Sequence, residues 1–137
     1  MFLLDTNVVS DLRRPKRITP AAAQWFGSVD SGQLYISTVT VFEIQHGIVE
    51  LRRRDAQRAA HLQGWLDTAV LSAFAGRIVA LDTVAAQRSA ELHAGRTRWD
   101  ADRMIAAIAL SRGMTLVTRN VGDFASMGVK VIDPFRG

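Results

Sequence analysis

The alternation of short apolar runs with longer helical segments limits the fold of this chain more than any other feature of its sequence. The short runs have the length of buried strands and are bounded by polar or capping residues. Between them, apolar residues recur three or four positions apart, which predicts helices. The strands are predicted over residues 2–4, 33–37, 77–81, 115–118 and 130–132. Short strands that alternate with longer helices predict an α/β fold whose parallel sheet is covered by helices on both faces.

Capping residues set several of the predicted helix boundaries. Thr19 followed by Pro20 is a typical helix start. Asp82 and Asp100 precede two later helices as N-caps, and Gly113 ends the second of these. The predicted helices cover residues 8–12 and 20–29, two consecutive stretches between 38 and 71, and the segments that follow the two aspartate caps.

The composition indicates one globular domain. The chain has 137 residues, of which 48% are hydrophobic and 22% charged, so it can build one core and is too apolar for intrinsic disorder. We therefore expect a single domain over residues 1–137. The absence of cysteine excludes disulfides, thiolate metal ligands and thiol catalysis. No apolar run reaches the roughly 20 residues that span a membrane, and no signal peptide is visible, so we expect a cytoplasmic protein with no membrane partner.

The charge balance is basic and rests on arginine. Lys and Arg together number 17 against 13 Asp and Glu, a formal charge of +4, and only Lys16 and Lys130 are lysines. The planar guanidinium group suits phosphate. A nucleic-acid partner is one explanation of this balance, and a bias of the genome towards arginine codons is the other.

Four acidic residues stand at unusual places in this pattern. Asp5 ends the first predicted strand, Glu43 lies in an apolar stretch near a helix start, and Asp102 opens an apolar helix. Asp123 follows the fourth predicted strand. Each has an ordinary structural explanation, because acidic side chains stabilise helix N-termini as caps and through the helix dipole. Asp100 is fully explained as an N-cap, so no chemistry is assigned to it.

Taken together, the four acids predict a metal site. All of them follow a strand or lie in the first turns of a helix, and these positions converge on one edge of a parallel sheet. Carboxylates gathered there repel one another, and a divalent cation removes that repulsion. Carboxylate oxygens without thiolates favour Mg²⁺ or Mn²⁺. In an arginine-rich chain, such a site suggests metal-assisted attack on a phosphodiester, with arginines holding the flanking phosphates.

Four segments of the chain together resemble a PIN-domain ribonuclease, and more closely the VapC/FitB-type toxins of type II toxin–antitoxin modules. The segments are FLLDTNVVSDL, STVTVFEIQHGI, WDADRMIAAIAL and TLVTRNVGDF. The resemblance covers nearly the whole chain, and the order and spacing of the segments match. It implies a three-layer α/β/α sandwich and a Mg²⁺- or Mn²⁺-dependent endoribonuclease that a cognate protein antitoxin neutralises. It also implies a homodimer, or a larger toxin–antitoxin hetero-oligomer.

The resemblance assigns roles to individual residues. The family's catalytic and metal-binding acids fall on Asp5, Glu43, Asp102 and Asp123. The supporting positions of the first and last motifs are Thr6, Asn7, Thr118 and Asn120. Many relatives carry an acid where this chain has Asn120, so either Asp123 or Asn120 completes the metal shell, directly or through water.

The expected contacts to RNA and to an antitoxin lie outside the acidic set. Arg96, Arg98 and Arg119 are nearest in sequence to the acids and are the predicted contacts to RNA phosphates. The run 52–54 with Arg58 is predicted as a solvated helix end, with an RNA or antitoxin contact as its functional alternative. The apolar surface of the helices predicted over 38–75 exceeds what one sheet face needs, which favours a groove for a partner's helix, with the antitoxin as the expected partner. The residues expected to leave this groove are Phe42, Ile48, Leu51, Leu62, Trp65, Leu66 and Phe74. The alternative to a nuclease is a catalytically silent PIN-like module that binds RNA or protein without cutting.

Overall fold

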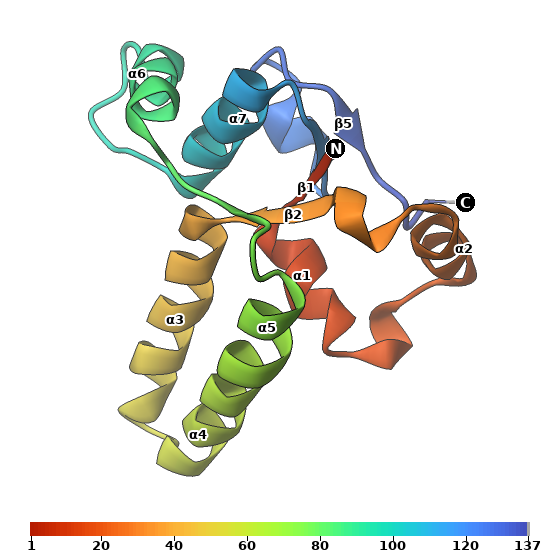
Figure 1. Cartoon of the computed structure of the whole chain (residues 1–137). Coiled ribbons are helices and arrows are strands. Elements are labelled where there is room, and N and C mark those ends of the chain that lie inside the picture. Colours follow the sequence, from red (N-terminus) through yellow and green to blue (C-terminus); the bar gives the residue numbers. More distant parts are fainter. Residues whose placement is uncertain (137) are drawn as a thin grey trace.

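The computed structural model describes residues 1–136 and contains one five-stranded sheet in which all strand pairs are parallel. The strands are β1 (Phe2–Leu4), β2 (Leu34–Ser37), β3 (Ile78–Val79), β4 (Thr115–Val117) and β5 (Val131–Ile132), in the spatial order β3-β2-β1-β4-β5 (Figure 1). The predicted α/β fold with its parallel sheet is therefore confirmed.

Helices connect the first four strands, as the alternating pattern predicts, whereas only a 3₁₀ turn lies between β4 and β5 (Figure 1). They are α1 (Thr6–Leu12), α2 (Pro20–Ser28), α3 (Thr38–Arg52), α4 (Ala56–Trp65), α5 (Leu71–Ala73), α6 (Thr83–Leu92) and α7 (Ala101–Arg112). Three 3₁₀ turns, at Pro15–Arg17, Ser31–Gln33 and Val121–Phe124, and a π-helical turn at Leu66–Val70 complete the regular structure of residues 1–136. Within the described residues, no helix combines the length and the apolar content that crossing a bilayer requires.

The predicted boundaries differ from the structure at a few points. Gln33 belongs to a 3₁₀ turn rather than to β2, because the Asp30 side chain accepts a hydrogen bond from the Gly32 N–H and closes that turn. The strand predicted over 77–81 is shorter, since only Ile78–Val79 pairs with β2. The second helix after β2 is interrupted by the π-helical turn, which periodicity alone does not reveal.

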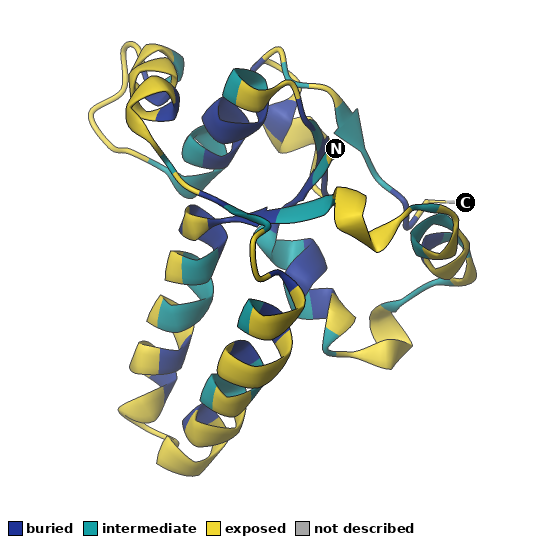
Figure 2. Ribbon diagram, viewed as in Figure 1, coloured by how far each residue is buried: buried dark blue, intermediate teal, exposed yellow. Residues whose placement is uncertain are grey.

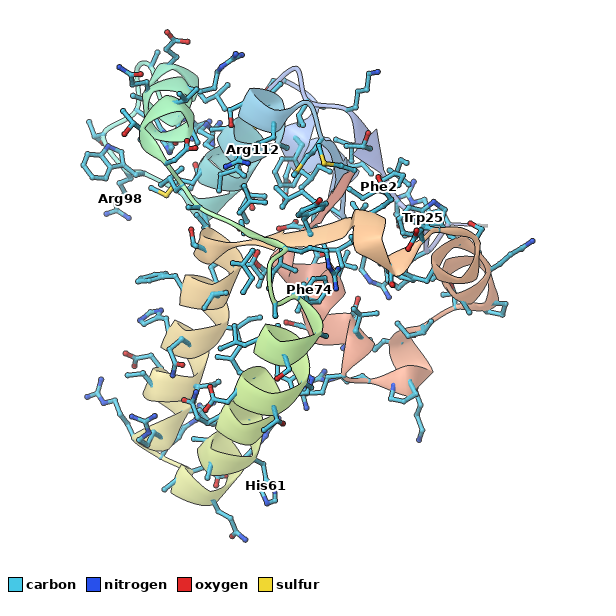
Figure 3. All side chains as sticks on the ribbon, viewed as in Figure 1. Phe2, Trp25, His61, Phe74, Arg98 and Arg112 are labelled. Carbon is cyan, nitrogen blue, oxygen red and sulfur yellow. The ribbon has the colours of Figure 1, made fainter. Side chains whose placement is uncertain are left out.

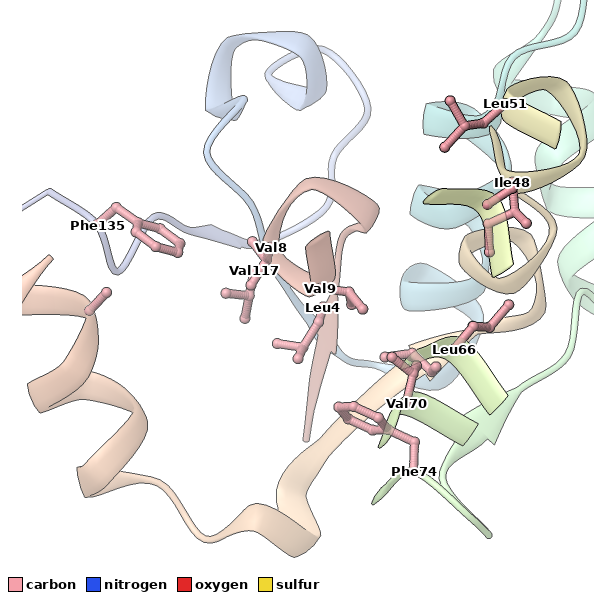
Figure 4. Packing of buried hydrophobic residues seen from close by; sticks show 13 residues of the cluster. Leu4, Val8, Val9, Ile48, Leu51, Leu66, Val70, Phe74, Val117 and Phe135 are labelled. Carbon is pink, nitrogen blue, oxygen red and sulfur yellow. The ribbon is translucent and has the colours of Figure 1, made fainter. Parts of the chain in front are cut away.

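Alternation along the strands builds two cores, one on each face of the sheet. Leu4, Ile36 and Val117 point into a core formed with α1, α2, α3, α4 and α5, part of which Figure 4 shows. Leu3 and Leu116 point the other way, into a core formed with α6 and α7. Side chains on a strand alternate between faces, so both faces must be covered. Figure 2 shows the resulting buried centre and exposed outer helix surfaces, and the three-layer sandwich is confirmed.

The topology gathers chain segments at the carboxyl edge of the sheet. The strand order reverses beside β1, whose neighbours β2 and β4 lead outward in opposite directions. In open parallel sheets, ligands bind at such a reversal point. α1 and α3 start there because they directly follow β1 and β2. α7 precedes β4, so it runs opposite to the strands and its N-terminus also reaches this edge.

Candidate active site

Asp5 lies at the reversal point of the sheet and is 4% exposed. It is the N-cap of α1, and its Oδ1 accepts a hydrogen bond from the Thr6 N–H at 2.8 Å. Its Oδ2 accepts one from the Thr118 hydroxyl at 2.8 Å and a longer one from the Asn7 amide at 3.4 Å. Asp5 therefore caps α1 and at the same time presents a fixed, buried carboxylate at the carboxyl edge of the sheet, so its structural role and its predicted functional role are compatible.

The Thr118 hydroxyl joins the first and last sequence motifs. Besides donating to Asp5, it accepts hydrogen bonds from the Asn7 amide at 3.2 Å and from the Asn120 backbone N–H at 3.0 Å. A hydroxyl has one proton to donate and two lone pairs, so this group is fully used. Thr118 is completely buried, and it therefore fixes the orientation of Asp5 from the end of β4.

A second chain of hydroxyl groups ends on Glu43. The Thr6 hydroxyl donates to Glu43 Oε1 at 2.6 Å, so its contact with the Thr40 hydroxyl at 3.0 Å must be donated by Thr40. The Ser37 hydroxyl in turn donates to Thr40 Oγ1 at 3.3 Å and accepts from the Thr40 N–H at 3.0 Å. Donors aligned in one direction polarise one another. The Glu43 carboxylate is therefore held at the start of α3, facing α1.

Asp102 and Asp123 complete the acidic set without such support. Asp102 is half-buried in the first turn of α7, and Asp123 is exposed in the 3₁₀ turn that follows β4. Their side chains accept no hydrogen bond from residues 1–136. Asn120 contributes its backbone N–H to Thr118, and its side chain does not cap the 3₁₀ turn.

Electrostatics shows that the acids form one group. Burial raises the pKa of Asp5 above its ordinary value, and the nearby charges of Glu43 and Asp123 raise it further, against the opposing hydrogen bonds from Thr118 and Thr6. Burial also raises the pKa of Asp102, followed by the charges of Asp5 and Asp123. Acids that perturb one another in this way lie close together. The charges of Glu43 and Asp123 act on Asp5, and the charge of Asp5 acts on Asp102, so each of these acids is a neighbour of Asp5. That all four side chains share one metal site stays a prediction.

A family model described as the PIN domain matches residues 2–130. The chain belongs to the PIN domain family. It is 37% identical to the plasmid stability protein StbB of Pseudomonas syringae pv. tomato, over 98% of this chain and 99% of the relative. It is 33% identical to the VapC ribonuclease Y4jK of Sinorhizobium fredii, over 98% of both chains, and 33% identical to the toxin FitB of Neisseria gonorrhoeae, over 98% and 99%.

Solved structures agree with this assignment. The crystal structure of FitAcB from Neisseria gonorrhoeae contains a chain that superposes on this PIN domain with a TM-score of 0.84 and 32% identity, covering 100% of both chains. A toxin–antitoxin complex from Klebsiella pneumoniae contains a chain with a TM-score of 0.65 and 27% identity, covering 98% of both. The resemblance seen in the four sequence segments is confirmed.

Asp100 does only what its position predicts. It is the N-cap of α7, accepts from the Arg103 N–H at 2.8 Å, and pairs with the Arg103 guanidinium at 2.5 Å. Although burial raises its pKa, these contacts with Arg103 prevail and hold the pKa below its ordinary value. An acid stabilised in its charged form by an internal partner needs no cation, which separates Asp100 from Asp102 two residues later.

Of the three arginines predicted to bind RNA phosphates, Arg119 is engaged in contacts within the protein. Arg119 pairs with the buried Asp11, donates to the Arg17 carbonyl at 2.9 Å and stacks over the Phe135 ring at 3.8 Å. Its guanidinium is therefore engaged in holding chain segments together. Arg96 and Arg98 lie on the exposed loop between α6 and α7, and Figure 3 shows Arg98 at the periphery of the molecule.

Sequence reasoning missed three residues that shape the site. Ser37 and Thr40 orient Thr6, and through it Glu43. Their signal is the polar pair in the segment STVT, where β2 ends and α3 begins, although only the fold shows that both are buried. Asp11 was not singled out, and its burial next to Arg119 is visible only in three dimensions.

A groove opens from Glu43 along α1, α3 and α4, with a volume of about 300 Å³. Four of the residues expected to leave a groove line it, namely Ile48, Leu51, Leu62 and Trp65. Leu66 and Phe74 are instead buried in the core, and Phe42 projects from the exposed side of α3. The groove is less apolar than expected, because Arg13, Arg54 and Arg58 line it too.

The donor set suits a hard cation that keeps part of its water shell. No three His, Asp or Glu side chains within residues 1–136 already form a closed metal-binding group. Mg²⁺ commonly binds through one or two carboxylates and retains several waters, so a closed protein cage is not needed. Two acids with raised pKa values, Asp5 and Asp102, are groups that a cation would help to ionise.

Proposed function

We propose that this PIN domain is an Mg²⁺- or Mn²⁺-dependent endoribonuclease that acts as a toxin and is neutralised by a cognate protein antitoxin. The observation that carries the proposal is the buried Asp5 carboxylate, which Thr6 and Thr118 orient. This carboxylate interacts electrostatically with Glu43, Asp102 and Asp123. Burying mutually repelling acids is costly unless a cation neutralises them.

The names of the relatives support the same activity. One relative matched over nearly its whole length is named a VapC ribonuclease, another is named a toxin, and one structural neighbour is part of a toxin–antitoxin complex. From these we propose RNA as the substrate and a protein antitoxin as the partner. The chain carries an acid at each of the four positions that the resemblance assigns to the family's acidic set, with Asn120 where many relatives have a further acid.

Asp5 and Asp102 are the residues that would hold the cation, because both are partly or fully buried and carry raised pKa values. Glu43 and Asp123 would complete the shell directly or through water, and Asn120 is the alternative to Asp123. When bound, Mg²⁺ or Mn²⁺ polarises the phosphodiester and lowers the pKa of a bound water molecule. Hydrolysis breaks the bond to the 3′-oxygen and leaves a 5′-phosphate and a 3′-hydroxyl.

The chain's own residues prepare this chemistry. Thr118 and the Thr6 N–H fix the two oxygens of Asp5, and the Thr6 hydroxyl fixes Glu43, so neither carboxylate has to reorganise during the reaction. One carboxylate of the set accepts the proton of the attacking water. The carboxyl edge of the sheet supplies both groups from rigid element ends, which suits precise positioning.

A homodimer is part of the proposal, with the exposed apolar side of α3 as the surface that a second copy covers. Phe42 is 68% exposed and stacks on His46 at a centroid distance of 5.9 Å. With Val41 and Val49, these residues line a shallow hollow on the outside of α3. Exposed apolar surface of this kind favours association. Light scattering of the wild-type chain and of Phe42→Asp tests this, with a monomeric Phe42→Asp expected.

The test of the proposed activity is cleavage of total cellular RNA by the purified, antitoxin-free chain. Reactions with Mg²⁺, Mn²⁺ and EDTA are compared with a folded Asp5→Asn variant. We expect discrete, metal-dependent cuts that the variant does not make, with 5′-phosphate ends. Equal cleavage by Asp5→Asn would refute the site, and a folded wild type that binds RNA without cutting would favour the catalytically silent module.

A further inference from the structure

The groove that leaves the acidic site ends at three arginines. Thr6 and Glu43 line it at the sheet, whereas Arg13, Arg54 and Arg58 line it at the far ends of α1 and α3 and the first turn of α4. Both α1 and α3 begin at the carboxyl edge of the sheet and run away from it (Figure 1). α4 lies beside α3. The groove therefore connects an acidic end with a basic end.

Helical spacing explains how the same surface carries both charges. On α1, Thr6 and Arg13 are seven residues apart and lie on one face, at a separation of roughly 10 Å for a rise of ~1.5 Å per residue. Along α3, the groove passes from Glu43 over Gly47 to Leu51. Arg54 lies just past the end of this helix, on the order of 15 Å from Glu43. This length is several nucleotides of a strand at about 3.4 Å or more per nucleotide.

The three arginines are not engaged by acidic partners. Within residues 1–136, none of them forms an ion pair with a carboxylate, whereas the neighbouring Arg53 pairs with Glu50 at 3.4 Å. Arg13 is half-buried over the Trp65 ring at 5.7 Å. Burial lowers the pKa of Arg13, and the like charges of Arg14 and Arg58 lower it further. Guanidinium groups that line one groove and have no carboxylate partner among the described residues form a site that an anion stabilises.

We propose that Arg13, Arg54 and Arg58 form a phosphate subsite that holds the RNA backbone several nucleotides from the bond cleaved at Asp5 and Glu43. The inference rests on the proposed ribonuclease activity. A nucleic-acid strand repeats a phosphate at every nucleotide, so one strand can place one phosphate at the acids and another at the arginines. The guanidinium fork matches phosphate geometry. Trp65 lines the same groove and lies beneath the Arg13 guanidinium, which it helps to position.

This subsite replaces the arginines that the sequence favoured. Arg119 is committed to Asp11 and Phe135, and Arg96 and Arg98 lie on a loop outside the groove. Arg54 and Arg58 lie at the turn between α3 and α4, which Figure 2 shows as exposed. Under this proposal, Arg54 and Arg58, which the sequence predicts as part of a solvated helix end, form the basic end of the groove.

The chain offers a matched control for testing the subsite. Arg52→Ala/Arg53→Ala and Arg54→Ala/Arg58→Ala remove the same charge from the same exposed turn, but only the second pair lines the groove. Both double variants are made in the full chain carrying Asp5→Asn, which prevents cleavage. Binding of a fluorescein-labelled, mixed-sequence 20-nucleotide single-stranded RNA is measured by anisotropy across a salt series, with a 20-residue polyglutamate peptide as the second probe. Thermal melting verifies the fold.

We expect Arg54→Ala/Arg58→Ala to weaken RNA binding by about 10- to 100-fold and to reduce the slope of log K against log salt by about 1.4, the value for two phosphate contacts on a single strand. Arg52→Ala/Arg53→Ala should change the affinity less than about threefold. Equal weakening by both pairs would overturn the subsite and indicate a general charge effect. Loss of polyglutamate binding with unchanged RNA binding would overturn it in favour of an acidic protein partner.

Cleavage by the wild-type chain is measured separately, so that the two proposals fail independently. If the wild type cuts RNA and the two double variants bind RNA with equal affinity, the subsite is wrong and the ribonuclease proposal stands. If the folded wild type neither cuts nor binds RNA, the proposed function itself is wrong.

Discussion

The two halves of the acidic site are built differently. Asp5 and Glu43 extend from α1 and α3, on one side of the reversal point, and hydroxyl and amide groups hold both carboxylates. Asp102 and Asp123 come from α7 and the turn after β4, and their side chains receive no hydrogen bond from the described residues. The protein itself orients the carboxylates of the first half. The carboxylates of the second half are not held by hydrogen bonds from residues 1–136, and we call this the unrestrained half.

This difference suggests a division of labour. A carboxylate that is already oriented binds a cation with little further loss of side-chain entropy, because that entropy is lost on folding. An unrestrained carboxylate can adapt to a cation and its waters. We therefore expect the protein to define where the cation sits through Asp5, and the cation to order Asp102 and Asp123. Substitutions at four residues test this comparison, from the largest expected effect to the smallest.

The largest effect should separate the two acids of the unrestrained half. Asp102→Asn should lower the rate of RNA cleavage by at least about a thousandfold, because it would remove a half-buried ligand of the proposed cation, worth several kcal/mol. Asp123→Asn should cost about 10- to 100-fold, because the exposed side chain would act through water. Single-turnover cleavage with saturating Mg²⁺ measures both. Equal losses would show that Asp123 is as directly involved as Asp102.

An intermediate effect should come from the residue that orients Asp5. Thr118→Val keeps the shape of the side chain but removes its hydroxyl, and should reduce activity by about 10- to 100-fold. It should also shift Mg²⁺ binding to higher pH, because the Thr118 hydrogen bond lowers the pKa of Asp5. Thr118→Ser restores the hydroxyl and should recover both properties. A Thr118→Val variant with a wild-type pH profile would mean that Thr118 contributes packing only.

The smallest effect concerns stability and its dependence on pH. Burial raises the pKa of Asp5 in the folded protein, so below about pH 4 this group is protonated in the folded and unfolded states alike. As the pH rises through the raised pKa, the metal-free wild type must ionise a buried carboxyl and loses stability. Asp5→Asn avoids this loss and should be more stable in EDTA at pH 7, by about 0.5–2 kcal/mol.

Urea denaturation from pH 3.5 to 8 measures this difference, which should vanish at the acidic end. Added Mg²⁺ should reverse the order at pH 7, because a ligand that binds only the folded state stabilises it by mass action. An Asp5→Asn variant that is less stable in EDTA at every pH would show that the hydrogen bonds to Asp5 outweigh its burial.

Local sequence signals account for most of the fold. The Asp5, Thr19, Ser37, Asp82 and Asp100 side chains all accept hydrogen bonds from the first turn of the helix that follows them. Such caps act within three or four residues, so they can be read without knowledge of the fold. The 3₁₀ turn at Gln33 is also local in origin, since the Asp30 side chain closes it. The shortness of β3 is not local, because it reflects how many residues pair with β2.

The sequence by itself determined the alternation of strands and helices, and with it the edge at which Asp5, Glu43, Asp102 and Asp123 meet, because chain connectivity dictates where parallel strands end. The tertiary structure alone decided which polar residues support those acids and which arginines share their groove. Thr118 reaches Asp5 across 113 positions, and Arg119 turns inward to Asp11 across 108. Contacts of that kind depend on how elements pack, and no local pattern in the chain encodes them.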